Sequence, residues 1–271
     1  MGKRKQKQTK QDKIRSEPFF GSGPGETRMK PGGLSAILQK GWGFFLETCY
    51  PKRCPFCGNI PHSGEICPEC KSQITYIDQA FCLKCGKHLT SETEEYCMDC
   101  CRRRHEFVQG RSLYCYRGAV KTSLYRFKYS NKREYAEVYA EEMKRYLGRW
   151  IERAEVQVLI PVPIHKKRRR VRDYNQAEIL AFALGRKMHL PVDRKSLVRV
   201  LNTAPQKNLD AKARKENLRQ AFICRSEAVR GKNILLVDDI YTTGATVDAA
   251  AAALKQSGAE KIYVITVASG G

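Results

Sequence analysis

The sequence predicts an α/β fold in which a parallel sheet carries helices on both faces, preceded by a small cysteine-rich domain. Continuous apolar runs of strand length predict buried parallel strands. Segments of helical periodicity separate these runs, and this alternation builds parallel sheets. Cysteines in closely spaced pairs crowd the first half of the chain, which indicates a metal-stabilised domain there.

The length of 271 residues allows about two domains. We expect a basic disordered tail (1–33), the cysteine-rich domain (34–106) and the α/β domain (107–271). Lys and Arg number 50 against 28 Asp and Glu, so the formal net charge is +22. Such a charge draws a protein to polyanions, because binding releases counterions from their phosphates. A merely solvated basic surface is the alternative.

The sequence offers no membrane or export signal. The N-terminus is a Lys- and Gln-rich run without an apolar stretch, and Lys40 and Glu47 interrupt the apolar segment 34–50. We therefore expect a cytoplasmic protein without membrane insertion, whose thiols stay reduced.

Four C-x2-C pairs predict metal binding. Four thiolates complete a tetrahedral Zn²⁺ site and leave no open position, so eight predict two structural zinc ions. Pairing along the chain gives one ribbon at 54–70 and another at 82–100. The alternatives are a cross-braced pairing, Cys101 in place of Cys100, disulfides, or an iron–sulfur cluster. The eight expected ligands are Cys54, Cys57, Cys67, Cys70, Cys82, Cys85, Cys97 and Cys100.

The rest of the chain alternates strands and helices. The strands expected are 113–116, 156–162, 234–237 and 262–267, and the helices are 134–151, 175–188 and one from Ala245 that ends at Gly258. The aromatic stripe of helix 134–151 should lie in the core. Short strands at 197–200 and near Ile223 flank the polar excursion 199–217, which we expect to close over the site. Ligands bind at the carboxyl ends of parallel strands.

Segment 233–246 is the most informative part of the chain. A buried strand leads into Asp238 and Asp239, then a turn rich in Thr and Gly, then a helix. A helix N-terminus is short of acceptors and carries partial positive charge, so it suits a phosphate. Carboxylates at the strand end can accept hydrogen bonds from neighbouring sugar hydroxyls. The segment predicts a ribose 5-phosphate site; an ordinary capped connection is the alternative.

This segment resembles the binding motif of the type I phosphoribosyltransferases, which hold phosphoribosyl pyrophosphate (PRPP). The resemblance implies a type I phosphoribosyltransferase-like sheet, with Mg²⁺ accompanying PRPP. Asp238 and Asp239 would be the catalytic acids that take the ribose hydroxyls. The 5-phosphate would be held by Thr242, Thr243, Gly244, Ala245 and Thr246.

A basic loop at 166–172 should lie at the same edge of the sheet, because it follows a parallel strand. Pyrophosphate binds best where cationic side chains and strand-end amides converge. A solvated basic loop is the alternative. The candidate pyrophosphate ligands are Arg168, Arg170, Arg172, Asn175 and Gln176.

The order of the segments resembles the ComF (ComFC/GntX-like) family, bacterial proteins with a double zinc ribbon ahead of a phosphoribosyltransferase-fold domain. The resemblance covers about 34–268 and rests on the ribbons, Ile160-Pro-Val-Pro-Ile-His165, Arg172-Asp-Tyr-Asn-Gln-Ala177 and Val237-Asp-Asp-Ile-Tyr-Thr-Thr-Gly-Ala-Thr246. It implies a role in natural competence. The expected partners are single-stranded DNA, PRPP and other proteins of the DNA-uptake machinery.

The sequence departs from the family pattern at two places where a glycine is usual. Asp173 precedes the Tyr-Asn-Gln segment, and Asn131 follows Phe127-Lys-Tyr-Ser130. Asp and Asn best tolerate a positive φ, so both backbone turns should survive.

Three functions fit the sequence. The first is a competence protein whose ribbons and basic surface bind single-stranded DNA, with the PRPP pocket as a binding or regulatory site. The second is an active phosphoribosyltransferase that uses Mg-PRPP in nucleobase or nucleotide metabolism. The third is a PRPP-sensing transcription regulator, which the lack of a helix-turn-helix pattern disfavours.

Overall fold

The computed structural model describes residues 53–62, 65–165, 169–170, 172–201 and 220–270. The predicted tail 1–33, the first part of the ribbon domain, Arg168 and most of the excursion 199–217 lie outside the described residues. The elements are α2 (Pro68–Gln73), α3 (Met98–Arg102), β1 (Gln109–Cys115), α4 (Gly118–Tyr129), α5 (Tyr135–Arg153), β2 (Val158–Pro161), α7 (Gln176–Met188), β3 (Leu197–Arg199), β4 (Phe222–Cys224), the 3₁₀ turn η1 (Glu227–Val229), β5 (Asn233–Tyr241), α9 (Ala245–Gln256) and β6 (Lys261–Ser269).

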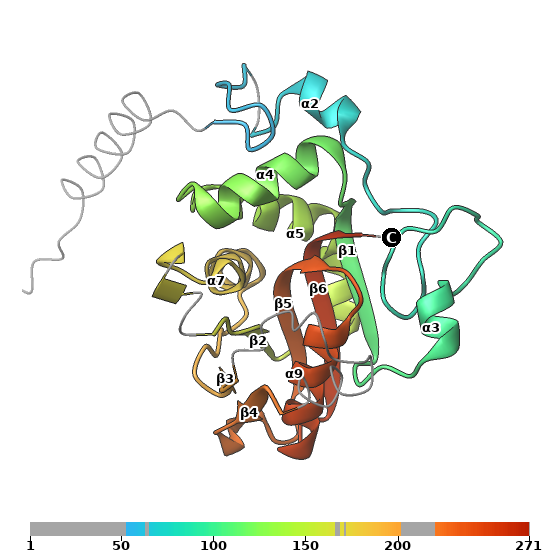
Figure 1. Ribbon diagram of the computed structural model, residues 1–271, viewed down its shortest axis with the longest axis vertical. Coiled ribbons are helices and arrows are strands. Elements are labelled where there is room, and N and C mark those ends of the chain that lie inside the picture. The colour runs from blue at the N-terminus through green and yellow to red at the C-terminus, as the bar shows by residue number, and fades with distance from the viewer. Residues whose placement is uncertain (1–52, 63–64, 166–168, 171, 202–219, 271) are drawn as a thin grey trace, which may run out of the picture. The chain divides into compact units, whose positions relative to one another are not determined.

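The described residues form a four-stranded sheet with the order β1-β6-β5-β2, which Figure 1 shows side by side. Every pairing in it is parallel. The strands are rich in Ile, Leu and Val because both of their faces are buried. The α/β prediction is confirmed. The expected short strands form a separate antiparallel pair, β3 with β4.

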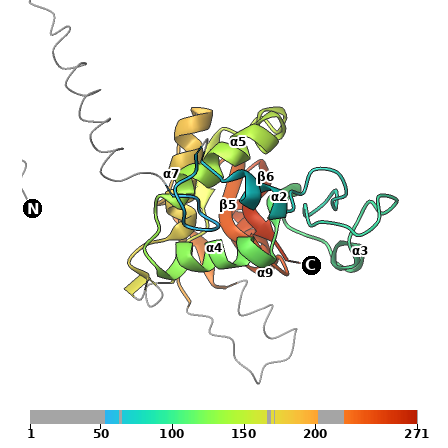
Figure 2. The ribbon, with the colours of Figure 1, turned by 90° about the horizontal axis from the view of Figure 1, so that it is seen from above.

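Apolar side chains of the sheet alternate between two buried clusters. In β5, Leu235 and Val237 join the cluster that contains α5 and α7, whereas Ile234 and Leu236 join the one that contains α9. This alternation follows from the period of two in a strand. Figure 2 shows α5 and α7 on one side of β5 and β6, and α9 on the other. The helices therefore cover both faces, as predicted.

The first half of the aromatic stripe of α5 lies in the core, as expected, whereas Tyr146 in the second half is exposed. Tyr135 and Tyr139 are almost fully buried, and Tyr139 shares a hydrogen bond of 2.5 Å with Ser123 of α4. Tyr146 stacks on Tyr76 with ring centroids 4.4 Å apart.

The structure differs from the sequence-based boundaries at two places. β5 continues past Val237 and includes both acids, because β6 pairs with it as far as Tyr241. Helix α4 was not predicted, because its apolar residues are few and they are interrupted by two Lys, one Arg, one Thr and one Ser, while its two Tyr side chains are exposed.

Both backbone turns at the departures from the family pattern are present. Asn131 has φ +51° and Asp173 has φ +61°, so each residue adopts the left-handed conformation expected of a glycine replacement. Among the residues that the structure describes, no helix has both the length and the apolar character needed to cross a bilayer.

Candidate functional site

A cavity of about 270 Å³ lies at the carboxyl ends of the parallel strands. Three strand ends contribute to it: Tyr116 follows β1, Val162 follows β2, and Asp238 belongs to the end of β5. Parallel strands bring their carboxyl ends to one edge, so segments distant in sequence meet there. Of the predicted site residues, those that line it are Arg172, Asn175, Gln176, Asp238, Asp239, Thr242 and Thr246.

The two carboxylates of β5 have different surroundings. Asp239 forms an ion pair of 2.9 Å with Lys128 at the end of α4. Asp238 accepts a hydrogen bond of 2.8 Å from the backbone N–H of Asp239. Burial, followed by the charge of Asp239, raises the pKa of Asp238 to about 7. Asp239 is thus paired with a lysine, while the pKa of Asp238 lies close to neutral pH.

The loop after β5 leaves amide donors for an anion. Gly244, the N-cap residue of α9, has φ +77° and supplies no side-chain cap. A Cβ at this position would lie 2.3 Å from the Tyr241 hydroxyl, so only glycine fits the turn. Thr242 and Thr246 face the cavity, and the Thr243 and Ala245 positions lie between them in the same turn. The uncapped helix start and flanking hydroxyls have the chemistry of a phosphate site.

Cationic side chains also line the cavity. Lys128, Arg172 and Arg199 all contribute to its wall. Arg172 donates a hydrogen bond of 2.7 Å to the Tyr129 hydroxyl and another of 3.4 Å to Gln176 Oε1. Arg170 is exposed and does not line the cavity. The cavity therefore pairs two carboxylates with three cations, which suits a ligand carrying both hydroxyls and phosphates.

Asn175 and Gln176 are buried and already hydrogen-bonded within the protein. Asn175 caps α7 by accepting from the Ala177 N–H, and its Nδ2 donates to the Val162 carbonyl at 3.0 Å. Gln176 donates to the Lys128 carbonyl at 3.3 Å. These bonds tie the loop after β2, the start of α7 and the end of α4 to one another. Both residues thus shape the wall of the cavity.

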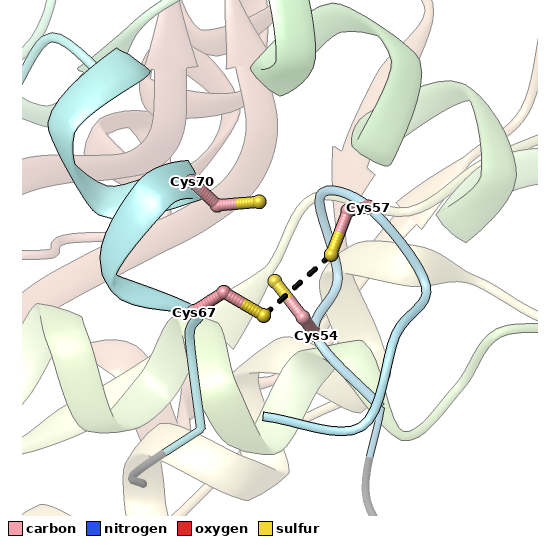
Figure 3. Close-up of side chains that lie close together, drawn as sticks. All are labelled: Cys54, Cys57, Cys67 and Cys70. Atoms are coloured by element: carbon pink, nitrogen blue, oxygen red, sulfur yellow. Dashed lines mark hydrogen bonds between the residues drawn. The ribbon is translucent and has the colours of Figure 1, made fainter. Parts of the chain in front are cut away.

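The eight predicted cysteines form two four-cysteine clusters paired along the chain. In Figure 3, Cys54 and Cys57 of the first loop and Cys67 and Cys70 at α2 point toward one another. All sulfurs of a cluster lie within 4.8 Å of each other. A tetrahedral Zn²⁺ with Zn–S bonds of about 2.3 Å requires S–S separations of about 3.8 Å, so both clusters fit zinc.

The clusters thus follow the order of the chain and are not cross-braced, and the described cysteines form no disulfide. Cys101 lies outside the second cluster and is exposed. In the first cluster the Asn59 N–H lies 3.4 Å from Cys57 Sγ, as expected of a turn that points amides at a metal-bound sulfur. These are closed four-thiolate sites, whose role is structural.

Sequence reasoning missed two sets of residues. Lys128 was noted only as part of a family segment, and its pairing with Asp239 arises from the packing of α4, a helix that the pattern did not predict. His105 and Asp248 lie 143 positions apart yet approach to 2.8 Å. The sequence feature that could have identified His105 is its place five residues after Cys100, just beyond the last cysteine pair.

Comparisons with known proteins match both parts of the chain. A family model described as a double zinc ribbon domain matches residues 45–101, which include all eight cysteines. A model described as a phosphoribosyl transferase domain matches residues 183–271, which include Asp238, Asp239 and the loop after them.

Curated relatives extend over most of the chain. Competence protein ComFC of Bacillus subtilis is 31% identical over 200 residues, 72% of this chain and 79% of the relative. DNA utilization protein YhgH of Escherichia coli is 29% identical over 220 residues, 80% of this chain and 94% of the relative. Competence protein F of Haemophilus influenzae is 36% identical over 111 residues, 40% of this chain and 48% of the relative.

Proposed function

Because the chain belongs to the ComF family, we propose that it binds single-stranded DNA during DNA uptake and holds PRPP in the cavity beside Asp238 and Asp239. The single observation that carries the proposal is the convergence of two carboxylates, three cations and an uncapped helix start on one cavity. Zinc coordination by thiolates also favours a cytoplasmic location, where thiols stay reduced.

Each part of PRPP has a matching group in the cavity. The ribose hydroxyls would donate to Asp238 and Asp239, and the 5-phosphate would accept from the amides and hydroxyls of 242–246. The pyrophosphate would face Lys128 and Arg172, so the Lys128–Asp239 ion pair would open when the ligand enters. Mg²⁺ would arrive with PRPP and screen its pyrophosphate, and the two carboxylates are oxygen ligands of the kind it takes.

Binding of PRPP is tested by titration calorimetry with Mg-PRPP. The wild type should bind, and the double variant Asp238→Asn/Asp239→Asn should lose binding because amides are weaker acceptors for the sugar hydroxyls. Asp99→Asn is the matched control, since Asp99 pairs with Lys87 on the second ribbon and does not line the cavity. Equal affinity of the double variant and the wild type would refute the pocket.

The surface beside the cavity supports the DNA part of the proposal. Tyr125 and Tyr129 stand one turn apart on α4, with exposed fractions of 62% and 51% and ring centroids 4.9 Å apart. Lys121 is exposed one turn earlier on the same face. The Arg172 guanidinium lies 4.8 Å from the centre of the Tyr129 ring. Aromatic rings set among cations are the usual platform for unpaired bases.

This surface is tested by fluorescence anisotropy with a labelled oligo(dT). We expect Tyr125→Ala/Tyr129→Ala to weaken binding by about ten-fold or more, because each base stack is worth about 1–3 kcal/mol. Tyr146→Ala is the control, since this partly exposed tyrosine lies on α5 and stacks on Tyr76. Affinity should also fall steeply with added salt. Equal binding of duplex DNA, or no effect of the double variant, would contradict a stacking platform.

A second function, phosphoribosyl transfer, is favoured by the same cavity. The cations beside Asp239 would stabilise the departing pyrophosphate, and the carboxylates would orient the sugar for attack by an acceptor. An assay of PRPP consumption against a panel of nucleobases, with and without single-stranded DNA, separates the two functions. Release of pyrophosphate that depends on a base would establish the transferase.

A further inference from the structure

The second zinc ribbon contacts α9, the helix that begins at loop 242–246. We call this loop the phosphate loop, because it would hold the 5-phosphate in the proposed function. His105, almost fully buried, follows the last cysteine pair, and its Nε2 lies 3.4 Å from the Sγ of the zinc ligand Cys100. Its Nδ1 lies 2.8 Å from Oδ2 of Asp248 in α9. The neighbouring Glu106 N–H donates to the other oxygen of Asp248 at 3.1 Å. Both oxygens of Asp248 thus bind the segment that leaves the ribbon.

Asp248 lies where its position determines that of the phosphate loop. Its backbone N–H donates to the Gly244 carbonyl at 2.8 Å, the first hydrogen bond of α9. The turn closed by this bond contains Thr246, which lines the cavity. A displacement of Asp248 would therefore move the donors that face the 5-phosphate.

Aromatic contacts also connect the end of the second ribbon to the phosphate loop. Phe107 stacks on His105, with centroids 4.9 Å apart, and meets Tyr241 edge-on at 6.3 Å. The Tyr241 ring lies against Gly244, where a Cβ would contact its hydroxyl. Cys82 and Cys85 pack in the same cluster as Tyr241 and the first turn of α9. The ribbon thus contacts the loop through Asp248 on one side and through Tyr241 on the other.

The first ribbon has no such contact among the described residues. Its Cys54 and Cys67 belong to the cluster on the other face of the sheet, with α5 and α7. The segment that follows it is joined to α5 by the 2.5 Å hydrogen bond from the Tyr76 hydroxyl to Glu142. Of the two zinc sites, the second therefore lies next to the phosphate loop and the first does not. An experiment can compare the two sites on this basis.

We propose that His105 is a positioning residue that couples the second zinc site to the phosphate loop, so that zinc at Cys82–Cys100 and PRPP strengthen each other's binding. The coupling rests on the proposed PRPP site. Groups that orient a metal ligand affect metal retention. Coupling between two binding sites is reciprocal, so a bound ligand must retain the metal as much as the metal favours the ligand.

The test measures zinc release to the chelator 4-(2-pyridylazo)resorcinol, with and without Mg-PRPP. In the wild type, PRPP should slow the release of one zinc of the two and leave the other unchanged. His105→Phe keeps the aromatic packing and removes both polar contacts. It should retain two zinc ions at rest, lose the protection by PRPP, and bind PRPP about ten-fold more weakly. Asp248→Asn should act in the same direction.

Asp99→Asn is again the matched control, because it removes an ion-paired carboxylate from the same ribbon without touching α9. It should keep the protection by PRPP. A wild type that binds PRPP but releases both zinc ions at ligand-independent rates would overturn the coupling alone. A His105→Phe protein with wild-type protection and affinity would do the same. A wild type that binds no PRPP would overturn the proposed function, and the coupling with it.

Discussion

Asp238 is a site residue whose burial opposes stability at neutral pH. Its pKa of about 7 exceeds the usual value near 4, so between these pH values the folded protein binds a proton that the unfolded chain releases. The free energy of unfolding therefore contains a favourable contribution below pH 4 that is lost as the pH rises through 7. The proposed sugar ligand, whose hydroxyls would donate to an ionised carboxylate, would account for such a group.

Asp238→Asn should remove this pH dependence. We expect the free energy of unfolding of the variant, relative to the wild type, to rise between pH 4 and 7 and to level off above 7. Urea unfolding at a series of pH values measures it. A difference between the two proteins that stays constant over this range would show that burial does not perturb Asp238.

Gly244→Ala tests the turn of the phosphate loop. It should lower the free energy of unfolding by about 2 kcal/mol or more, because a left-handed conformation and a contact with the Tyr241 hydroxyl both oppose a Cβ. Gly231→Ala is the control: its φ is +65° but a Cβ would meet nothing within 4 Å. The difference between the two variants isolates the contact with Tyr241. Equal losses would mean that the tyrosine moves aside freely.

At the scale of elements, the site depends on how α4, α7 and α9 begin and end around the sheet. Tyr174 donates a hydrogen bond to the Phe127 carbonyl, which ties the loop before α7 to α4. Asn175 both caps α7 and holds the Val162 carbonyl after β2. The wall of the cavity is therefore set by helix ends that are hydrogen-bonded to their neighbours.

Asn175→Ala should lower the free energy of unfolding by about 1–2 kcal/mol, because it removes a buried N-cap and leaves the Val162 carbonyl without this donor. Ser226→Ala removes the cap of the short turn η1, whose N–H at Ala228 is exposed, and should cost less. Denaturant unfolding of both variants gives the comparison. A cost for Asn175→Ala no larger than that for Ser226→Ala would argue against its bracing role.

At the scale of the whole molecule, the two zinc ribbons pack on opposite faces of one sheet. Cys54 and Phe56 join the apolar cluster of α5, and Cys82 and Leu89 join that of α9. Gly86 lies so close to β1 that a Cβ would be 2.4 Å from the Gly110 carbonyl. Because of this packing, we expect the stability of the sheet to depend on the metals.

Removal of zinc should therefore destabilise the α/β part as well as the ribbons. We expect protein treated with a chelator under reducing conditions to melt at a lower temperature in scanning calorimetry, as one transition shared with the sheet. Restoring Zn²⁺ should reverse the change, whereas Mg²⁺ should not, because thiolates prefer zinc. An unchanged main transition would mean that the ribbons fold independently of the sheet.

The sequence by itself determined the local chemistry of this protein: the zinc ligands, the parallel strands, and the acid pair followed by a hydroxyl-rich turn. Each depends on residues close together in the chain, whose spacing and hydrophobic period are visible in the sequence. Only the tertiary structure decided that Lys128 meets Asp239, that the ribbons occupy different faces, and that His105 reaches Asp248. These contacts join residues far apart in the chain, and they depend on how helices pack on the sheet, which no local pattern records.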